Sequence, residues 1–545
     1  MDIKNQIKTE LENLLPKLGI NEAVSFDILN TKDKKFGDYS TNLGMKLTKI
    51  LKANPLQIGE KIKNLLSESK LFSKIEIQGP GFINFFVNEN DLSDIVKAII
   101  NDPNNFGRGD KKDKRINIEF VSANPTGKLH LGHARIAAIG DSLNNVLCYL
   151  GYQCKKEYYV NDCGNQIENL GLSVYARYLE LFGKEFSIPE DGYQGKDIIN
   201  VAKFLKEKYD QKFIEKYEEN KQLIIRESIN FELEIIKKDL KDFGVVFDIF
   251  AFESDIRNKK DYSLSKLIFD LKPYTYEKDG ATFLKTTDFF DDKDRPIIKS
   301  DGTYTYFAPD ISYHLNKFNR GFDEIIDILG SDHHGYINRM KSAIKMKGFN
   351  EQDLKVIFVQ VVRLMDGDVE IKMSKRTGNA LTLQELMEEV GKDAMRYFFL
   401  SRTASGHLDF DFNLAKDTSS KNPVYYVKYA HARLSKILRD ATTKQLDFSK
   451  KSEVEYKKES EKRILKDLNS FKEILSKIEN TYDVSLLINY VFKLSTDVHF
   501  FYNDVVIFDE NNLETTVSRL RLVNASKIIL KKCLDLLGVE APEHM

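Results

Sequence analysis

Two histidines flank one glycine in SANPTGKLHLGHAR, residues 122–135, as His130, Gly132 and His133. The segment follows a short apolar run, INIEFV, and precedes a helical pattern, so both histidines are expected at the N-terminus of a helix. Unpaired backbone N–H groups and the helix dipole favour phosphate there, and two imidazoles add further donors. Gly132 lets a flat ring or a phosphate lie close to the backbone. These residue types suit a nucleoside triphosphate.

The expected helix shows in the apolar spacing that follows the motif. Four apolar residues recur at i, i+3, i+4 and i+7 and a glycine follows them: Leu143, Val146, Leu147, Leu150 and Gly151. Two other interpretations of the histidines stay open, a chance occurrence and a zinc site. Histidines at i, i+3 supply only two zinc ligands, and no Cys or carboxylate lies at an obvious partner spacing, so we expect no metal site.

A second candidate phosphate-binding segment is VEIKMSKRTGN, residues 369–379. Lys372, Lys375 and Arg376 crowd a short polar loop before a predicted helix, LTLQELMEEV. Such a loop can bring ammonium groups onto a polyphosphate as charge shifts to the leaving group. This motif alone is weak, but paired with His-x-Gly-His in this order it is a strong signal.

Short apolar runs at 116–121, 323–329 and 356–362 are the elements that must position these residues. Such runs are typical of strands buried on both faces of a parallel sheet. We therefore predict a multidomain α/β chain with a Rossmann-like, doubly wound parallel-sheet catalytic domain at 111–415, including an insertion around 170–290.

The two ends of the chain have different patterns. Residues 1–110 combine helices with paired strands about a Gly-Pro-Gly turn, which predicts an N-terminal α+β module ending in a linker at 101–115. Residues 416–545 carry long amphipathic stretches, which predict an all-α helical bundle.

Composition narrows the class of protein. The 545 residues carry 82 Lys and Arg against 83 Asp and Glu, so the net charge of -1 neither announces nor excludes a nucleic-acid binder. Four scattered cysteines form no disulfide framework or metal knuckle, and no run of about 18 apolar residues occurs. These features predict a cytoplasmic protein without a membrane partner.

The two motifs together resemble the signatures of the class I aminoacyl-tRNA synthetases, in HLGH at 130–133 and KMSKR at 372–376. The fifth position of the second signature is usually serine and is Arg376 here, but both lysines are present. The resemblance implies an ATP site, which we assign to these residues: His130, Gly132, His133, Lys372, Met373, Ser374 and Lys375. Of these, the two histidines, the glycine and the two lysines are assigned to catalysis.

Further segments resemble the arginyl-tRNA synthetase branch along nearly the whole chain, including FGDYSTNLGMKL, GPGFINFF, YYVNDCGNQI, DGTYTYFAPDISYH, LGSDHHGY and NPVYYVKYAHAR. The closing LGVEAPEHM also resembles the family and suggests a complete chain. The resemblance implies an arginine-binding set: Glu119, Ser122, Asn124, Tyr306, Asp310 and His333.

These residue types also make physical sense for arginine. A guanidinium is planar and permanently charged, so it needs carboxylates that accept hydrogen bonds, with an aromatic ring or hydroxyl completing the enclosure. Glu119 and Asp310 supply the acids. Ser122 and Asn124 can hold the α-amino group or carbonyl instead, and an ordinary salt bridge at a strand end is the other interpretation of Glu119.

RNA contact is expected on the helical domain and on the N-terminal module. Residues 421–439 carry five Lys or Arg and no acid, with tyrosines between them, which suits phosphate neutralisation and base stacking. Some of these tyrosines, and Phe82, can equally belong to a core. The resemblance implies an anticodon-binding C-terminal domain and a D-loop reader at the N-terminus. The candidate tRNA contacts are Phe82, Asn84, Tyr425, Tyr426, Lys428 and Arg433.

The resulting hypothesis is ATP-dependent ligation of arginine to tRNA(Arg) through arginyl-adenylate, with Mg²⁺ accompanying ATP, no permanent cofactor and a monomeric enzyme. The resemblance also implies that adenylate formation can require bound tRNA.

Three alternatives are another class I synthetase, a nucleotidylyltransferase and a non-catalytic RNA-binding paralogue. A cysteinyl enzyme would need zinc ligands, a glutamyl enzyme a basic pocket, and a paralogue should have lost signature residues.

Overall fold

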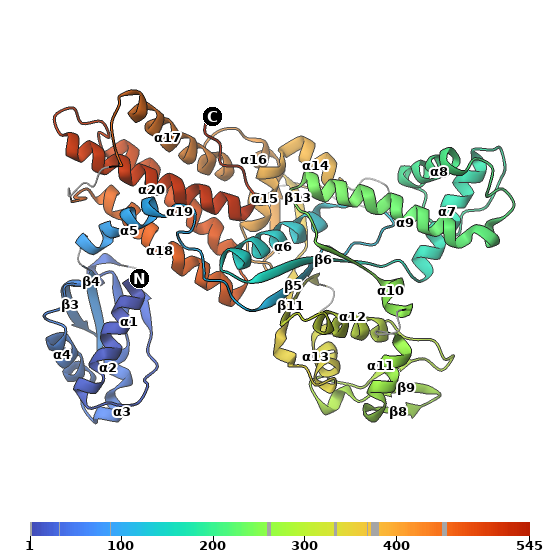
Figure 1. Cartoon of the computed structure of the whole chain (residues 1–545), viewed down its shortest axis with the longest axis horizontal. Helices are drawn as coiled ribbons and strands as arrows, with labels where there is room; N and C mark the ends of the chain where they lie inside the picture. Colours follow the sequence, from blue (N-terminus) through green and yellow to red (C-terminus); the bar gives the residue numbers. More distant parts are fainter. Residues whose placement is uncertain are drawn as a thin grey trace.

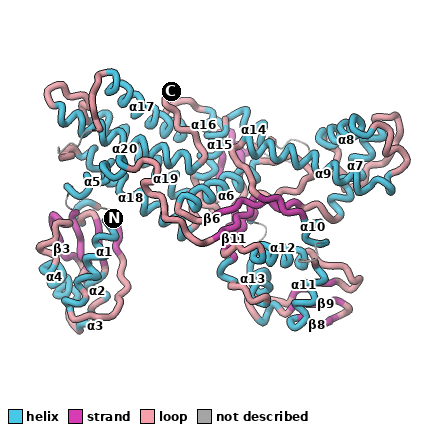
Figure 2. Tube along the Cα trace, viewed as in Figure 1, coloured by secondary structure: helices cyan, strands magenta, loops and turns pink. Residues whose placement is uncertain are grey.

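The computed structural model describes residues 3–31, 33–87, 89–258, 263–331, 335–367, 369–371, 381–449 and 455–545. A small N-terminal module lies beside a helical bundle, and a central sheet carries two projecting groups of elements (Figure 1). Figure 2 shows a group of strands, including β6 (Gln153–Val160) and β11 (Glu324–Gly330), at the centre of the molecule. Among the described residues, no helix combines the length and apolar character needed to cross a membrane.

The N-terminal module is an antiparallel sheet covered by short helices. Its strand order is β1 (Ile28–Asn30), β2 (Tyr39–Thr41), β4 (Phe82–Val87) and β3 (Phe72–Gln78). Its helices are α1 (Ile3–Leu14), α2 (Leu43–Lys46), α3 (Thr48–Leu51) and α4 (Pro55–Leu65). The predicted strand pair about Gly-Pro-Gly is confirmed as the β3–β4 hairpin. The segment NLGMKLTKILK, whose pattern predicts one helix, forms two short helices instead, α2 and α3.

The helix that follows this module belongs by its contacts to the other end of the chain. α5 (Glu89–Asn101) packs on two helices of the bundle, α18 (Glu459–Thr481) and α20 (Leu513–Leu537). Residues 102–114 form no helix or strand, as the linker prediction requires. They are nevertheless packed, because Phe106 is buried and stacks on Phe471 with ring centroids 6.3 Å apart. The linker is thus a strap, meaning an extended segment that packs against the helical bundle through Phe106.

The central sheet has five parallel strands. Their order is β12 (Leu354–Val359), β11 (Glu324–Gly330), β5 (Arg115–Phe120), β6 (Gln153–Val160) and β7 (Ile249–Phe252). In chain order this is a doubly wound arrangement whose direction reverses between β5 and β11, where ligands of such sheets bind beyond the carboxyl ends of the strands. The doubly wound prediction is confirmed.

One predicted strand is divided by the structure. The runs at 116–121 and 323–329 match β5 and β11, but the run at 356–362 ends as β12 at Val359 and resumes at Val362 as β13 of another sheet. Gln360 breaks it, because its N–H donates to Ala404 O and its carbonyl accepts from the buried Arg135 guanidinium. A run of apolar residues cannot reveal such tertiary contacts.

α6 (Leu131–Tyr149) packs closely on β5. A Cβ added at Gly140 would lie 2.4 Å from the Phe120 ring, so the helix and strand approach closely only with glycine there. The helix ends as predicted at Gly151, which has a φ of 93°. The N–H of Gly151 donates to Cys148 O and that of Tyr152 to Leu147 O, which satisfies the last carbonyls.

Two groups of elements project from the sheet. Between β6 and β7 lie α7 (Asn165–Glu180), α8 (Lys196–Tyr209) and α9 (Tyr217–Asp242). Between β7 and β11 lie α10 (Glu253–Asn258), α11 (Leu264–Leu271), β8 (Thr275–Lys278), β9 (Ala281–Leu284), β10 (Arg295–Ile298) and α12 (Phe307–Asn319). α13 (Tyr336–Met346) connects β11 to β12. Figure 1 shows α6 on one side of the sheet and α12 with α13 on the other.

A small sheet and three helices follow β12. The strand order is β14 (Val369–Glu370), β13 (Val362–Asp366) and β15 (Leu408–Asp411), and the helices are α14 (Leu383–Val390), α15 (Lys392–Leu400) and α16 (Phe412–Lys416). α14 occupies the predicted helix. Thr382 caps it in a reciprocal arrangement with Glu385.

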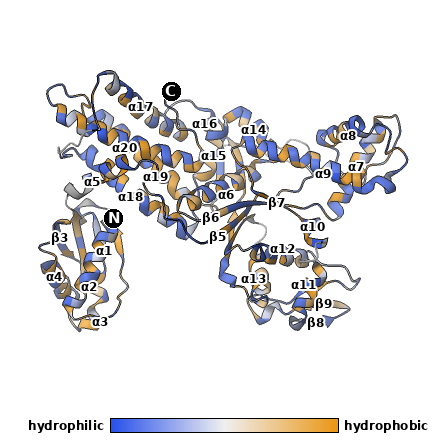
Figure 3. Ribbon diagram, viewed as in Figure 1, coloured by the Kyte–Doolittle hydropathy of each residue, from blue (hydrophilic) through white to orange (hydrophobic). Residues whose placement is uncertain are grey.

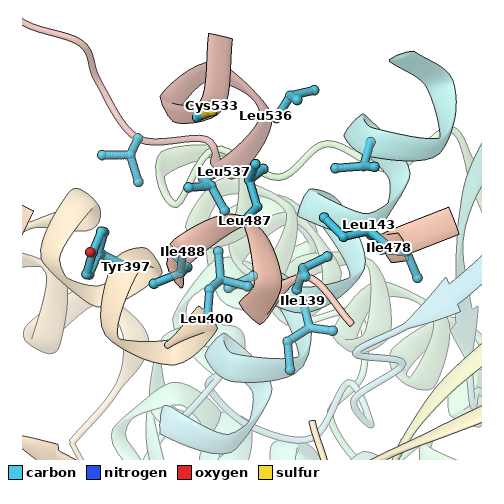
Figure 4. Close-up of a cluster of buried hydrophobic side chains, with 14 of the residues drawn as sticks. Ile139, Leu143, Tyr397, Leu400, Ile478, Leu487, Ile488, Cys533, Leu536 and Leu537 are labelled. Carbon is cyan, nitrogen blue, oxygen red and sulfur yellow. The ribbon is translucent and has the colours of Figure 1, made fainter. Parts of the chain in front are cut away.

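The C-terminal part of the chain is a helical bundle, as predicted. Its helices are α17 (Pro423–Thr443), α18 (Glu459–Thr481), α19 (Ser485–Asp504) and α20 (Leu513–Leu537). Figure 3 shows apolar and polar stripes along these helices. Side chains of α18, α19 and α20 meet those of α6 and α15 in one buried cluster, which joins the bundle to the central sheet (Figure 4).

Candidate active site

The N-terminus of α6 orders the two histidines of the first motif. His130 is the N-cap residue, and its Nδ1 accepts a hydrogen bond from Gly132 N at 3.2 Å. His133 Nδ1 accepts from His130 N at 3.3 Å, and the rings stack with centroids 3.8 Å apart. Because each Nδ1 is an acceptor, the neutral rings carry their protons on Nε2. Both imidazoles therefore present Nε2–H donors beside the positive end of the helix.

Gly132 has a packing role as well. A Cβ at this position would lie 3.2 Å from Cε1 of His130. A larger residue would therefore crowd the ring that caps the helix. Space for a substrate and space for the capping ring both favour glycine.

The segment that follows the second motif is hydrogen-bonded to the first motif. Residues 372–380 lie outside the described residues, and with them the predicted ATP-site residues Lys372, Met373, Ser374 and Lys375. On the near side, Ile371 N donates to Leu364 O at 2.8 Å. On the far side, Thr382 forms an antiparallel bridge with His130, and Leu383 N donates to Leu129 O at 2.8 Å.

A row of three acids crosses the sheet at the reversal point. Asp327 of β11, Glu119 of β5 and Glu157 of β6 are lateral neighbours in register. Register partners in parallel strands point to the same face, and adjacent strands are about 4.8 Å apart, so these buried carboxylates would repel one another if left uncompensated.

α12 lies over this face and supplies the opposite charges. Lys317 Nζ donates to Glu119 Oε2 and, at 2.9 Å, to Asp327 Oδ1. His314 Nε2 lies 2.7 Å from Asp327 Oδ2. Arg320 Nη2 donates to both oxygens of Glu157 at 2.8 Å.

These ion pairs determine the charge state of the buried groups. Burial alone would raise the pKa of Asp327, but the charges of Lys317 and His314 outweigh it and hold this pKa below its ordinary value. Burial would likewise lower the pKa of Lys317, and the negative charges of Asp327 and Glu119 raise it instead. The row of acids and the cations of α12 form one charge-balanced network.

Asp310, in the first turn of α12, differs from these acids. The residue as a whole keeps partial exposure, and its carboxylate has no hydrogen-bond or ion-pair partner among the residues that the structure describes. Burial, reinforced by the negative charges of Glu253, Glu119 and Asp327, raises the pKa of Asp310 to about 7, although the charge of His314 opposes the rise. The electrostatic coupling places Glu119 and Asp310 in one cluster.

Two other predicted residues lie beside this cluster. Ser122 Oγ donates to Glu119 Oε1 and accepts from Tyr159 N, both at 3.0 Å. Ser122 has a φ of 40°, an unusual backbone for a non-glycine residue directly after a strand. Asn124 is exposed, and its Nδ2 donates to Gln166 Oε1 at 2.7 Å.

The remaining arginine-site predictions are less closely placed. Tyr306 lies one turn before Asp310, but its side chain is 80% exposed and makes no ring contact or side-chain hydrogen bond with the described residues. His333 lies outside the described residues. The structure thus groups Glu119, Ser122 and Asp310 and leaves Tyr306 at the surface.

Sequence reasoning missed several members of the cluster. Glu253 is buried directly after β7 and accepts from Arg257 Nε at 2.7 Å. Its place at the carboxyl end of a parallel strand was a usable signal, because such ends meet at one edge of the sheet. Tyr159 and Tyr313 face each other with ring centroids 4.6 Å apart and had no distinctive spacing.

Aromatic and basic side chains also gather on α17 and α19. Arg433 lies over the rings of Tyr429 and Tyr502, at 4.7 and 4.2 Å from their centroids. Its Nη1 donates to His499 Nδ1 at 3.0 Å. Tyr426 lies 4.4 Å from the His499 ring, and exposed aromatic residues include Tyr429, Phe492, Phe500 and Tyr502.

The other predicted RNA contacts occupy different surroundings. Tyr425 stacks on Tyr429 at 6.4 Å, whereas Lys428 is ion-paired with Asp393 of α15. In the N-terminal module Phe82 is partly exposed at the hairpin, and Asn84 is only 3% exposed in the middle of the sheet. An RNA base could reach Phe82 more easily than Asn84.

Three protein-family models match successive parts of the chain. The family model "tRNA synthetases class I (R), catalytic domain" matches residues 95–403, which places this doubly wound chain among the class I aminoacyl-tRNA synthetases. "Arginyl tRNA synthetase N terminal domain" matches residues 1–87, and "DALR anticodon binding domain" matches 427–545.

Full-length relatives identify the family. An arginine–tRNA ligase of Listeria monocytogenes is 46% identical, covering 99% of both chains, and that of Bacillus subtilis is 44% identical, covering 100% of this chain and 99% of its own. The solved Thermus thermophilus arginyl-tRNA synthetase shares the fold, with a TM-score of 0.78, 20% identity and coverage of 99% and 100%. The chain belongs to the arginyl-tRNA synthetase family.

Proposed function

We propose that this chain ligates L-arginine to tRNA(Arg) in two steps. The arginine carboxylate attacks the α-phosphate of ATP, which forms the adenylate and expels pyrophosphate; a hydroxyl of the terminal ribose of the tRNA then attacks the arginyl carbonyl, and AMP leaves. Membership of the family supports this reaction. The observation that carries the choice of arginine is the acid cluster, in which Asp310 has no charge partner among the described residues.

The nucleotide end of the site is assigned to the first and second motifs. His130 and His133 would donate from Nε2 to the phosphates as charge develops, and Gly132 would leave room for them. Lys372 and Lys375 would hold the leaving pyrophosphate, and Met373 and Ser374 are proposed as further members of the ATP site. Mg²⁺ is proposed as the companion of ATP, because it binds phosphate oxygens with few protein ligands.

The arginine end is assigned to the acid cluster. Asp310 would accept from the guanidinium, with Glu119 beside it and Ser122 near the α-amino group. Asn124 is exposed beside the same strand end and would meet the amino or carboxyl end of the substrate. Tyr306 would close over arginine only if its exposed ring turned inward, and His333 remains a proposed member.

The tRNA is assigned to both ends of the chain. We propose 1–110 as the N-terminal tRNA-binding module, 111–415 as the catalytic domain and 416–545 as the anticodon-binding domain. The exposed aromatic residues around Arg433, with Tyr425 and Tyr426, support base stacking on α17 and α19. Lys428, Phe82 and Asn84 remain proposed contacts. We further propose a monomeric, cytoplasmic enzyme.

The test is charging of total tRNA with each of the twenty amino acids and ATP, together with pyrophosphate exchange with and without tRNA. Arginine alone should be attached. Attachment of a different amino acid would contradict the proposed substrate, and nucleotide transfer without tRNA charging would favour a nucleotidylyltransferase.

A further inference from the structure

The feature of α12 that the proposed reaction does not use directly is the buried amine of Lys317. Its side chain is fully buried, and an ammonium group removed from water is costly unless opposite charges compensate it. Two carboxylates do so, Glu119 and Asp327, and the ring of Tyr313 lies 4.4 Å from Nζ. The sequence HLNKF, in which this lysine lies, reads as an ordinary amphipathic helix.

The spacing along α12 explains how one helix serves both the substrate and the sheet. Asp310, His314 and Lys317 follow at i, i+4 and i+7, so they share one face of the helix. His314 also connects α12 with the sheet, because its Nδ1 lies 2.8 Å from the backbone oxygen of Asp310 and its Nε2 lies 2.7 Å from Asp327 Oδ2. His314 thus links the backbone of Asp310, not its carboxylate, to the buried Asp327.

Both oxygens of Glu119 are occupied in this arrangement. Oε1 accepts from Ser122 Oγ and Oε2 accepts from Lys317 Nζ. Asp327 shares the same ammonium group, Glu157 is matched by Arg320, and Glu253 is matched by Arg257. Only Asp310 is left without an ion-pair partner within the described part of this cluster.

We propose that Lys317 is a positioning residue for the arginine end of the site: its ammonium group, shared by Glu119 and Asp327, fixes Glu119 and leaves Asp310 as the one carboxylate that a substrate cation must neutralise. The proposal rests on the proposed function. Without Lys317, Glu119 and Asp327 face each other as neighbouring carboxylates, so one of them turns away or takes up a proton. Either change disturbs the arginine end and spares the histidines of the nucleotide end.

The experiment is arginine-dependent pyrophosphate exchange, with tRNA present, by the Lys317→Met enzyme between pH 6 and 9. The KM for arginine should rise about 10- to 100-fold, as for misplaced supporting groups, while the KM for ATP changes less than about twofold. The acid limb of kcat/KM for arginine should move to higher pH, because the cluster has lost a cation. A folded variant with unchanged KM for arginine and an unchanged limb would overturn the proposal.

A matched control and a second variant separate positioning from stability. Lys156 forms an ion pair with Asp141, with 2.8 Å between Nζ and Oδ1, and this pair is not part of the acid cluster. The Lys156→Met variant should therefore keep the arginine KM and the pH profile. The double variant Lys317→Met with Asp327→Asn loses one charge of each sign, which favours folding, yet it still leaves Glu119 without its ammonium partner. Its arginine KM should therefore stay raised.

Restoration of the wild-type KM in the double variant would show that the ammonium group is not needed to fix Glu119, and would also overturn the proposal. The same measurements keep the two hypotheses apart. Absence of arginine-dependent exchange in the wild-type enzyme would contradict the proposed function itself, whereas active wild type with unaffected variants would contradict only the role of Lys317.

Discussion

Arginine binding should release a proton near neutral pH, because the pKa of Asp310 is raised to about 7 in the ligand-free protein. The carboxylate must be ionised to accept from a guanidinium, and a bound guanidinium stabilises that form. Below pH 7 the group is mostly protonated, so binding must first remove the proton. Arginine affinity should therefore fall as the pH falls.

The magnitude follows from this value. The apparent dissociation constant should rise about tenfold for each pH unit below 7 and should level off above it. Binding should release about 0.9 proton at pH 6 and about 0.1 proton at pH 8. Asp327 contributes less, since the charges of Lys317 and His314 hold its pKa below its ordinary value.

Isothermal titration with arginine in two buffers of different ionisation enthalpy measures the proton count directly. If the free enzyme requires tRNA to bind arginine, the same dependence appears in the kcat/KM for arginine. The Asp310→Asn variant should lose both the proton release and about 2 to 5 kcal/mol of binding free energy. Equal affinity at pH 6 and 8 with no proton released would refute the assignment of Asp310.

Three further outcomes are expected. His133→Ala should slow pyrophosphate exchange about 100- to 1000-fold, and a normal rate would remove this histidine from the mechanism. Arg433→Ala should raise the KM for tRNA in charging assays and leave exchange KM values for ATP and arginine unchanged; equal tRNA affinity would argue against RNA on α17. Phe106→Ala should lower the thermal midpoint, with a loss of about 3 to 5 kcal/mol, because the ring packs on Phe471; unchanged melting would contradict the strap.

The sequence predicted elements best where local signals agreed. The two histidines expected at its N-terminus, the apolar spacing of α6 and Gly151 all pointed to one helix, and the structure has it from Leu131 to Tyr149. The prediction of one strand at 356–362 was wrong because Gln360, a polar residue inside the apolar run, forms hydrogen bonds with Arg135 and Ala404. Both partners lie far from Gln360 in the sequence. Local pattern does not contain such partners.

The site was predictable to a similar extent. Residue types and family resemblance led to Glu119 and Asp310, which the structure couples electrostatically. Lys317 was missed, since nothing in HLNKF announces burial or a shared partner, whereas the position of Glu253 directly after β7 was a usable signal. Register between β11 and β5 brings Asp327 and Glu119, the counter-charges of Lys317, together, and register is a property of the folded sheet.

The most direct measurement compares arginine with citrulline, which keeps the shape of arginine but replaces the charged guanidinium by a neutral urea. At pH 8 the enzyme should activate citrulline with a kcat/KM at least about 1000-fold lower than that for arginine. With citrulline bound, the carboxylate of Asp310 would lie in the occupied site without a cation. Citrulline activated within tenfold of arginine would contradict the claim that the unpaired charge of Asp310 selects the substrate.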